Sequence, residues 1–307
     1  MPEPYAIGLD LGGTDLKAGL VTFAGELRGF VRRPSRTEES ADAPFEVVLE
    51  TAAELGRRSG GPGPLPVGLG CPGVIEPGSG AQIGTTAHLP HWDGMAVRER
   101  LVPSLGSRVR VDNDANCAAL AEARIGAARG ARVSLTLTLG TGIGCGIVVD
   151  GRVMRGAHGG AGEIGHLPLG SGALRCRCGV ERCVEPEASA SGLVEAARAA
   201  GLEVADGAAV FAAAARGDAV ATQLVDRMAD RLGALISIAV DLLDPNIVVV
   251  GGGVAQAGEP LFARLHAALQ RYALRSHQRQ LRVVAAALGE RAGTIGAGLM
   301  AWEGEKP

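Results

Sequence analysis

Two patterns of apolar and polar residues alternate along this chain. Short apolar runs that end in glycine, acidic or amide residues are typical of buried strands, and we expect them at 5–10, 18–21, 66–69, 108–111, 133–139, 145–149, 247–250 and 281–286. Apolar residues spaced three or four apart predict helices at 43–58, 117–126, 190–200, 207–215, 219–243, 260–272 and 294–302. The mixture, with glycine turns at strand ends, predicts an α/β fold.

Glycine-rich turns join two pairs of these strands. Residues Asp10–Thr14 read D-L-G-G-T, and Leu139–Gly144 read L-G-T-G-I-G. A turn without bulky side chains lets backbone N–H groups approach phosphate oxygens, and an acid such as Asp10 can hold Mg²⁺ through water. A plain hairpin turn is the alternative for each, and neither is a P-loop because no Gly-Lys-Ser/Thr follows. The repeated strand–turn–strand unit suggests a duplicated architecture.

A third motif, Asn113–Asn116, reads N-D-A-N between a predicted strand and a predicted helix. A carboxylate beside an amide that can orient a hydroxyl suits a general base, which makes Asp114 a candidate. An aspartate at this position can equally serve as a helix N-cap. The pattern leaves the two interpretations even, and Asp112 is a weaker candidate for the base.

The segment Gly159–Cys183 contains His166, Cys176, Cys178 and Cys183 in the spacing H-x9-C-x-C-x4-C. Three sulfurs and one imidazole are typical of a tetrahedral structural Zn²⁺ site. Free thiols and a disulfide are the alternatives, although Cys176 and Cys178 are too close in sequence to bridge easily. Glu163 precedes the histidine in G-E-I-G-H, so we expect the metal to shape a binding loop.

Composition narrows the class of protein. With 307 residues, 21% of them charged, and a net charge of -3, the chain has room for two domains and shows no basic run for nucleic acid. The most apolar helical stretch, 232–243, contains Asp241 and is too short to span a membrane. The N-terminus lacks the charged and apolar regions of a secretory signal, and cysteines are few, so we expect a cytoplasmic protein.

Taken together, these motifs resemble the ROK family of bacterial sugar kinases and sugar-responsive repressors. The resemblance spans nearly the whole chain and is greatest to the ATP-dependent glucokinases. It rests on the four motifs above, on Gly68–Gly73 (G-L-G-C-P-G), and on Leu243–Gly253 (L-D-P-N-I-V-V-V-G-G-G). A winged helix, which the family's repressors carry, has no room before Asp10, so we do not expect DNA binding.

The resemblance implies an actin-like (ribonuclease H-like) fold of two α/β lobes with sugar and nucleotide in the cleft. The smaller lobe would comprise 1–116 and 295–307, and the larger lobe, with the zinc loop, 117–294. The expected reaction is phosphorylation of a hexose by Mg-ATP, most simply glucose to glucose 6-phosphate. Another sugar (N-acetylmannosamine, fructose, allose), polyphosphate as donor, or a non-catalytic sugar sensor are the alternatives. Family members are often oligomers, so a homodimer or homotetramer is expected.

The resemblance also implies a role for each motif residue. Asp114 would be the catalytic base, and the sugar would be bound by Gly73, Asn113, Asp114, Glu163, His166 and Glu185. Phosphates, Mg²⁺ and adenosine would be held by Asp10, Gly12, Gly13, Thr14, Gly140, Thr141, Gly142, Gly251, Gly252 and Gly253. Structural zinc would be bound by His166, Cys176, Cys178 and Cys183, with one imidazole nitrogen on the metal and the other facing the sugar.

The sequence departs from the family pattern at three positions. Asp15 stands where lysine is frequent, which reverses a charge near the phosphates. Arg182 stands where glycine is common, and His88 stands in the segment 86–90, where many relatives have asparagine. Trp92, close to His88, is expected to pack in the core and not to stack on a sugar.

Overall fold

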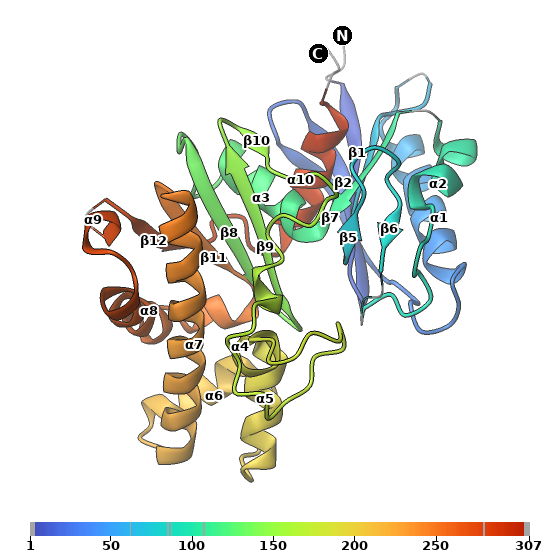
Figure 1. The fold of residues 1–307 in the computed structure, drawn as a ribbon. Helices are drawn as coiled ribbons and strands as arrows, with labels where there is room; N and C mark the ends of the chain where they lie inside the picture. Colours follow the sequence, from blue (N-terminus) through green and yellow to red (C-terminus); the bar gives the residue numbers. More distant parts are fainter. Residues whose placement is uncertain are drawn as a thin grey trace. The chain divides into compact units, whose positions relative to one another are not determined.

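The computed structural model describes residues 4–61, 63–84, 86, 88–106, 108–278 and 280–303. The contacts between Cα atoms divide the chain into two compact units, shown in Figure 1. The first consists of Met1–Arg129, Gly146–Ala161 and Glu290–Pro307, and the second of Gly130–Cys145 and Gly162–Gly289. Within the described ranges, every helix is too short or too polar to cross a bilayer.

The first unit is built on a five-stranded sheet of order β3-β2-β1-β4-β7. Its strands are β1 (Tyr5–Leu11), β2 (Asp15–Thr22), β3 (Leu27–Pro34), β4 (Val67–Cys71) and β7 (Val109–Asn113). The first three are antiparallel, and β4 and β7 run parallel to β1. A small hairpin pairs β5 (Val74–Ile75) with β6 (Gln82–Ile83).

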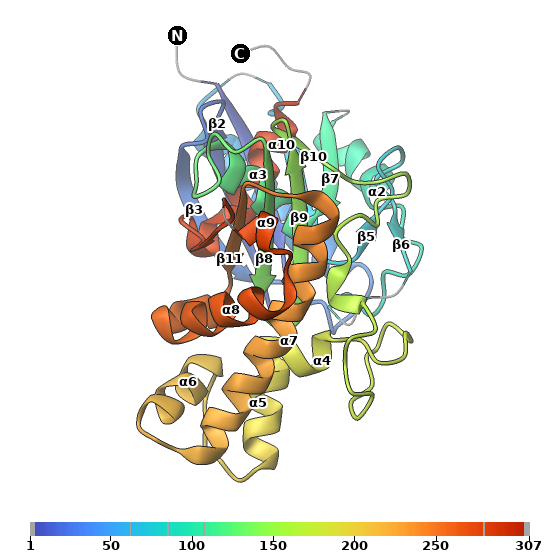
Figure 2. The same cartoon turned by 60° about the vertical axis from the view of Figure 1, so that its left-hand side comes forward.

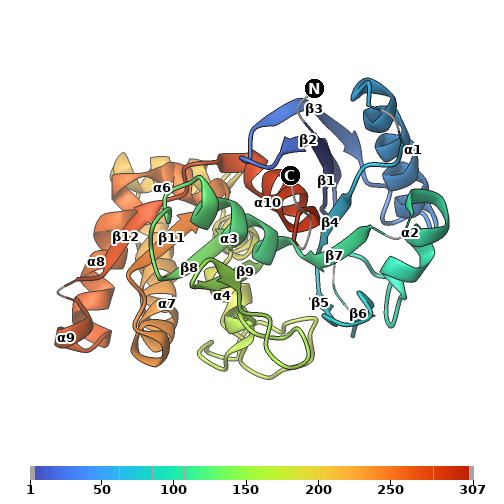
Figure 3. The ribbon, with the colours of Figure 1, turned by 90° about the horizontal axis from the view of Figure 1, so that it is seen from above.

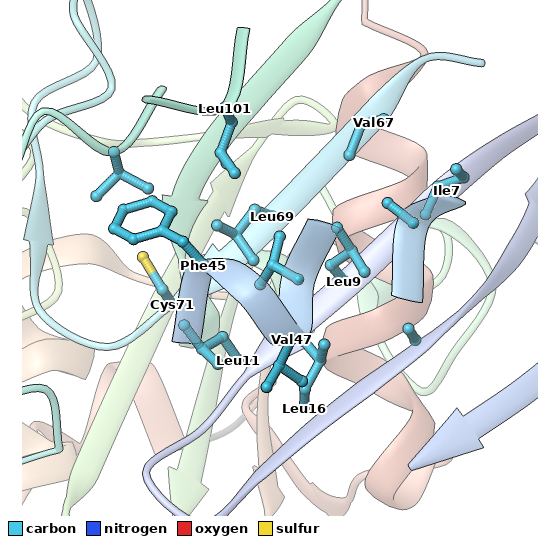
Figure 4. Close-up of a cluster of buried hydrophobic side chains, with 14 of the residues drawn as sticks. Ile7, Leu9, Leu11, Leu16, Phe45, Val47, Val67, Leu69, Cys71 and Leu101 are labelled. Carbon is cyan, nitrogen blue, oxygen red and sulfur yellow. The ribbon is translucent and has the colours of Figure 1, made fainter. Parts of the chain in front are cut away.

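Helices cover both faces of this sheet, as Figure 3 shows. One face carries α1 (Ala43–Arg58) and α2 (Val97–Leu105), and the other carries α3 (Asp114–Arg124) and α10 (Ala292–Ala301). Leucines of β1 and β2 form the core beneath α1, and Figure 4 shows Leu9, Leu11 and Leu16 gathered there with Phe45. Burial of such side chains stabilises the unit by roughly 1.5–3 kcal/mol each.

The opposite face of the sheet is lined with glycine where it meets α10. A Cβ on Gly8 of β1 would overlap the Thr294 carbonyl, and a Cβ on Gly68 of β4 would overlap the Ala297 carbonyl. Gly296 of α10 lies in the same way on the backbone of α3. These glycines let three backbones approach one another closely, so α10 fits between the sheet and α3.

The second sheet has the order β10-β9-β8-β11-β12, which repeats the order of the first. Its strands are β8 (Val133–Leu139), β9 (Ile143–Val149), β10 (Arg152–Val153), β11 (Ile247–Gly251) and β12 (Arg282–Ala285). Strand β11 runs parallel to both β8 and β12. The matching strand orders agree with the duplicated architecture that the two glycine turns suggested.

Helices of the second unit are seen best in Figure 2, where α7 lies beside α8. They are α4 (Glu185–Ala188), α5 (Ala190–Ala199), α6 (Gly207–Ala215), α7 (Ala219–Leu243), α8 (Glu259–Tyr272) and α9 (Arg275–Gln278). Short 3₁₀ helices span Ile164–His166, Gly253–Ala257 and Gly289–Arg291. The long helix α7 begins at an Asp218 cap and ends at Asp244, whose backbone is left-handed (φ 43°).

Most predicted elements are confirmed, with corrections at their ends. Helix α3 begins at Asp114 and α10 at Ala292, each earlier than the apolar periodicity indicated. The predicted helix 43–58 matches α1 at both ends. A lobe boundary between residues 116 and 117 would fall inside α3, a continuous helix that packs on α10 within the first unit. The division into functional lobes remains a prediction.

Candidate active site and metal centre

Two carboxylates stand at the carboxyl ends of parallel strands in the first unit. Asp10 lies near the end of β1, and Asp114 follows β7 as the first residue of α3. Burial raises the pKa of both, that of Asp10 to about 7, and the negative charge of Asp114 is the second cause at Asp10. The positive charge of Lys17, which pairs with Asp10 across β1 and β2, offsets part of the rise in the pKa of each acid. The two acids therefore interact, and Asp114 is more basic than an ordinary aspartate.

Asn113, and not Asp114, is the N-cap of α3. Its Oδ1 accepts hydrogen bonds from the backbone N–H groups of Ala115 (2.8 Å) and Asn116 (3.2 Å). Its Nδ2 donates to the carbonyl of Gly73 (3.1 Å), a residue whose φ of 97° requires glycine. The capping function that the sequence left open for Asp114 thus belongs to its neighbour, and the Gly73 loop is tied to the same strand end.

The Gly12–Gly13–Thr14 turn is held rigidly from the side of β3. The carbonyl of Gly13 accepts hydrogen bonds from the hydroxyls of Ser35 (2.9 Å) and Thr37 (2.7 Å). His88 also lies close to this turn, because a Cβ on Gly13 would be 3.1 Å from its Nδ1. His88 therefore borders the glycine turn, and its charge, when present, lowers the pKa of Asp114.

The departure at Asp15 is compensated within the first unit. Its carboxylate accepts a hydrogen bond from Arg32 on β3, and this bond holds the pKa of Asp15 below its usual value. Trp92 is buried, stacks on Phe45 with ring centroids 4.4 Å apart, and donates to the Ala41 carbonyl, so the expected packing role is confirmed.

Two glycine loops meet in the second unit. Gly252 has a φ of 86°, and a Cβ there would overlap the backbone of Leu139, where β8 enters the Gly140–Gly142 turn. The carbonyl of Gly140 accepts a hydrogen bond from Ala190 (3.0 Å) at the start of α5. A surface hollow of about 610 Å³ adjoins this turn and is lined by Gly140, Thr141 and residues of α5 and α6.

His166, Cys176, Cys178 and Cys183 come together, with their ligand atoms all within 4.8 Å of one another. The Nδ1 of His166 lies 3.7 Å from the sulfur of Cys176 and 3.8 Å from that of Cys183. Sulfurs and a nitrogen at such separations can share one ion with bonds of about 2.0–2.3 Å, as Zn²⁺ requires. All six cysteines are unbridged, which removes the disulfide alternative.

Two glutamates lie next to the cluster of one histidine and three cysteines. The Oε2 of Glu163 lies 3.6 Å from the Nε2 of His166, so the nitrogen that faces away from the cysteines has a carboxylate partner. Glu185 accepts a hydrogen bond from the Ile143 backbone (2.8 Å) and lies 3.7 Å from the Cys176 sulfur. The predicted sugar ligand Glu185 therefore also connects the metal loop to the end of the Gly140–Gly142 turn, a link that the sequence did not indicate.

Arg182 adopts the left-handed conformation (φ 60°) that glycine would supply at this position. Its Nε donates to the Gly170 carbonyl (3.1 Å), and the Gly170 N–H donates to the Arg182 carbonyl (2.7 Å). The arginine therefore keeps the turn, and this reciprocal pair holds the metal loop closed.

Comparison with known proteins places these features in a family context. The model of the ROK family matches residues 6–303. A glucokinase from Thermotoga maritima is 34% identical over 311 residues, which cover 97% of each chain. The crystal structure of a ROK hexokinase from Thermus thermophilus is 37% identical, with a TM-score of 0.84 over 98% of both chains. A ROK glucokinase from Streptomyces griseus, solved with glucose and AMPPNP, is 29% identical, with a TM-score of 0.82 over 97% of this chain and 99% of that one. These likenesses confirm the predicted actin-like α/β fold.

Proposed function

This chain belongs to the ROK family, and on that premise we propose that it transfers the terminal phosphoryl group of ATP to a hexose, with glucose as the principal substrate. The observation that carries the proposal is the pair of interacting carboxylates, Asp10 and Asp114, at the carboxyl ends of two parallel strands that flank β4. Phosphoryl transfer needs a positioned nucleophile and neutralised phosphate charge more than covalent help from the protein. One carboxylate can serve each requirement.

Asp114 is assigned the role of general base. As the sugar oxygen attacks the terminal phosphorus and the bond to ADP breaks, the hydroxyl proton passes to the Asp114 carboxylate. The raised pKa of this group favours the transfer, because a base works best when its pKa lies near the operating pH. Asn113 and the Gly73 loop, fixed to each other by a 3.1 Å hydrogen bond, are assigned to neighbouring sugar hydroxyls.

Asp10 and the Gly12–Gly13–Thr14 turn are assigned to the phosphates and to the Mg²⁺ that enters with ATP. The ion neutralises charge on the transferred group, and Asp10 would hold it through water. In the second unit, the Gly140–Gly142 turn is assigned to phosphate, and Gly251, Gly252 and Gly253 to the adenosine. The hollow beside Gly140 supports this assignment, since it offers space next to backbone without side chains.

His166, Cys176, Cys178 and Cys183 are proposed to hold a structural Zn²⁺. Four protein ligands fill a tetrahedral ion, so the zinc would shape the loop and take no part in the chemistry. Ligation through Nδ1 leaves the Nε2 proton of His166 toward Glu163, a partner arrangement common among zinc-bound histidines. Glu163, His166 and Glu185 are assigned to sugar hydroxyls, which acidic groups accept well.

The decisive experiment is an ADP-release assay with Mg-ATP against glucose, mannose, fructose, allose, N-acetylglucosamine and N-acetylmannosamine. We expect the highest kcat/KM for glucose. Preference for another sugar would keep the kinase and change its substrate. Silence with every sugar, in folded protein that contains zinc, would overturn the kinase assignment and favour a sugar sensor.

The role of Asp114 is tested by Asp114→Asn, which keeps the shape of the side chain and removes the base. We expect turnover to fall by roughly 10²–10⁴-fold while glucose affinity, measured by calorimetry, changes only a few-fold. Asp226→Asn, in an exposed Arg264 ion pair of the second unit, is the matched control and should leave kcat unchanged. Undiminished turnover in Asp114→Asn would remove this residue from the mechanism.

A dimeric or tetrameric assembly and a cytoplasmic location also remain predictions. Light scattering on the purified, zinc-containing protein tests the first, and fractionation of cells tests the second.

A further inference from the structure

Asp112, two residues before the proposed base, is a buried carboxylate with three hydrogen-bond donors. It is buried with 3% of its surface exposed, and it lies at the end of β7 beside Gly70 of β4. Its Oδ1 accepts hydrogen bonds from the Asn113 backbone N–H (2.8 Å) and from Asn116 Nδ2 (2.9 Å). Its Oδ2 accepts a hydrogen bond from Arg155 Nε (2.7 Å). Three donors therefore fix both oxygens of this buried carboxylate.

The two donors on Oδ1 span the joint between β7 and α3. Asn113 is the last residue of the strand, and Asn116 belongs to the first turn of the helix, so Asp114 lies between the two fixed points. The Oδ1 of Asn116 is buried and accepts no hydrogen bond from the described part of the chain. The bond to Asp112 therefore orients the Asn116 side chain, and it adds to the Asn113 cap in fixing the first turn of α3.

Arg155 compensates the buried charge of Asp112. Arg155 follows β10 in the chain, and its side chain is 25% exposed. Its Nη2 also lies 3.8 Å from Oε2 of a second carboxylate, Glu303. A buried carboxylate that loses its cation is costly, because the charge is then neither solvated nor paired. The ion pair thus allows a third acid to stand within the first unit beside Asp10 and Asp114.

We propose that Asp112 and Arg155 form a positioning pair that sets the orientation of Asp114 for proton abstraction. Asp112 touches neither substrate nor reacting atoms and acts through the backbone of Asn113 and the side chain of Asn116. This inference rests on the proposed function, since it presupposes a kinase in which Asp114 is the base.

The test variant is Asp112→Asn. Its single amide oxygen cannot accept from three donors, and its amide nitrogen must face Arg155 or Asn116, so the joint shifts. A displacement of about 1 Å at a reacting group can cost on the order of 100-fold in rate. We expect kcat to fall about 10–100-fold, with KM for glucose and ATP changed only a few-fold, because the binding groups remain.

A double-mutant cycle separates positioning from general loosening of the fold. If Asp112 acts through Asp114, then Asp112→Asn should lower the residual turnover of Asp114→Asn by less than about 3-fold. Fully multiplicative losses would overturn the proposal, as would an Asp112→Asn enzyme with wild-type kcat. Asp226→Asn again serves as the control for a lost aspartate–arginine pair.

Arg155 provides a second route that does not depend on Asp112→Asn folding. Arg155→Lys keeps a cation and should retain several-fold more kcat than Arg155→Met, with similar KM values for both. Equal turnover in the two variants and in the wild type would overturn the assignment. A wild-type enzyme that phosphorylates no sugar would refute the proposed function itself, whereas an active wild type with insensitive variants would refute only the positioning pair.

Discussion

The raised pKa of Asp10 predicts that this residue destabilises the folded protein at neutral and alkaline pH. In the unfolded chain the carboxyl ionises near its ordinary pKa of 3.8, whereas in the folded protein its pKa is about 7. The folded state therefore binds the proton more tightly. Asp10 contributes no penalty below pH 3.8, and the stability of the protein falls as the pH rises from there through 7. Asp10→Asn, which never ionises, removes that loss.

The size of the effect follows from the two pKa values. A single group with these values costs on the order of 4 kcal/mol of unfolding free energy at pH 8 relative to low pH. Because Asp10 is only partly buried, we expect solvent to reduce the gain of Asp10→Asn over wild type to about 2–4 kcal/mol at pH 8. The gain should shrink toward zero near pH 4. Kinase activity should be lost in the same variant, since the proposed Mg²⁺ and phosphate contact is removed.

Urea unfolding between pH 4 and pH 8, without Mg²⁺ or nucleotide, measures this difference. The protein has two tryptophans, Trp92 and Trp302, and both lie in the first unit with Asp10, so their fluorescence reports the unfolding of that unit. The neighbouring Asp15 is a control with the opposite sign. Arg32 lowers its pKa, so Asp15 stabilises the protein above pH 3.8, and Asp15→Asn should lose stability at neutral pH. Parallel pH curves for wild type and Asp10→Asn would refute the reasoning.

Three further predictions concern single side chains. Gly293→Ala should raise KM for Mg-ATP and lower kcat/KM at least 10-fold, because the new Cβ would overlap the Asp10 carboxyl. The control Gly56→Ala, in open space on α1, should only stabilise the protein, by roughly 0.5–1 kcal/mol. Equal kinetics for the two variants would contradict this prediction. Asp244→Gly should raise the unfolding free energy by about 0.5–1 kcal/mol, since the residue ends α7 with a φ of 43°, and a lower melting temperature would count against that strain. Cys178→Ser should remove bound zinc and lower both the melting temperature and glucose affinity, and wild-type protein that contains no zinc by elemental analysis would exclude the explanation.

The sequence was sufficient to predict the bounds of helices where the local signals are strong. The bounds of α6 and α7 match the predicted ranges, because each follows an aspartate cap, and α7 also has a regular apolar face. Strand β3 was missed, since it lies at the edge of its sheet and none of its residues is fully buried. Helix α2 was missed as well, because it contains Pro103 and buries only Val97 and Leu101.

The candidate site could also be predicted only in part from the sequence. Short-range motifs led to the roles proposed for Asp114, the glycine turns and the Cys–His set, because each is a cluster in sequence. The partners that tune them are distant along the chain or hidden in strand register. Arg155 is 43 positions from Asp112, and the pairing of Lys17 with Asp10 depends on the hairpin register of β1 and β2. No local sequence pattern predicts either contact.

The glycine-lined seat of α10 also constrains the order in which the first unit can be completed during synthesis. Strands β1 and β4 are made early, yet α10, the helix that packs on their glycines, begins only at Ala292. Until α10 has left the ribosome, the glycines of β1 and β4 lack the helix that packs on them. The first unit can therefore close around α10 only after the second unit's residues have been made, and its incomplete sheet is open to aggregation and to chaperones before then.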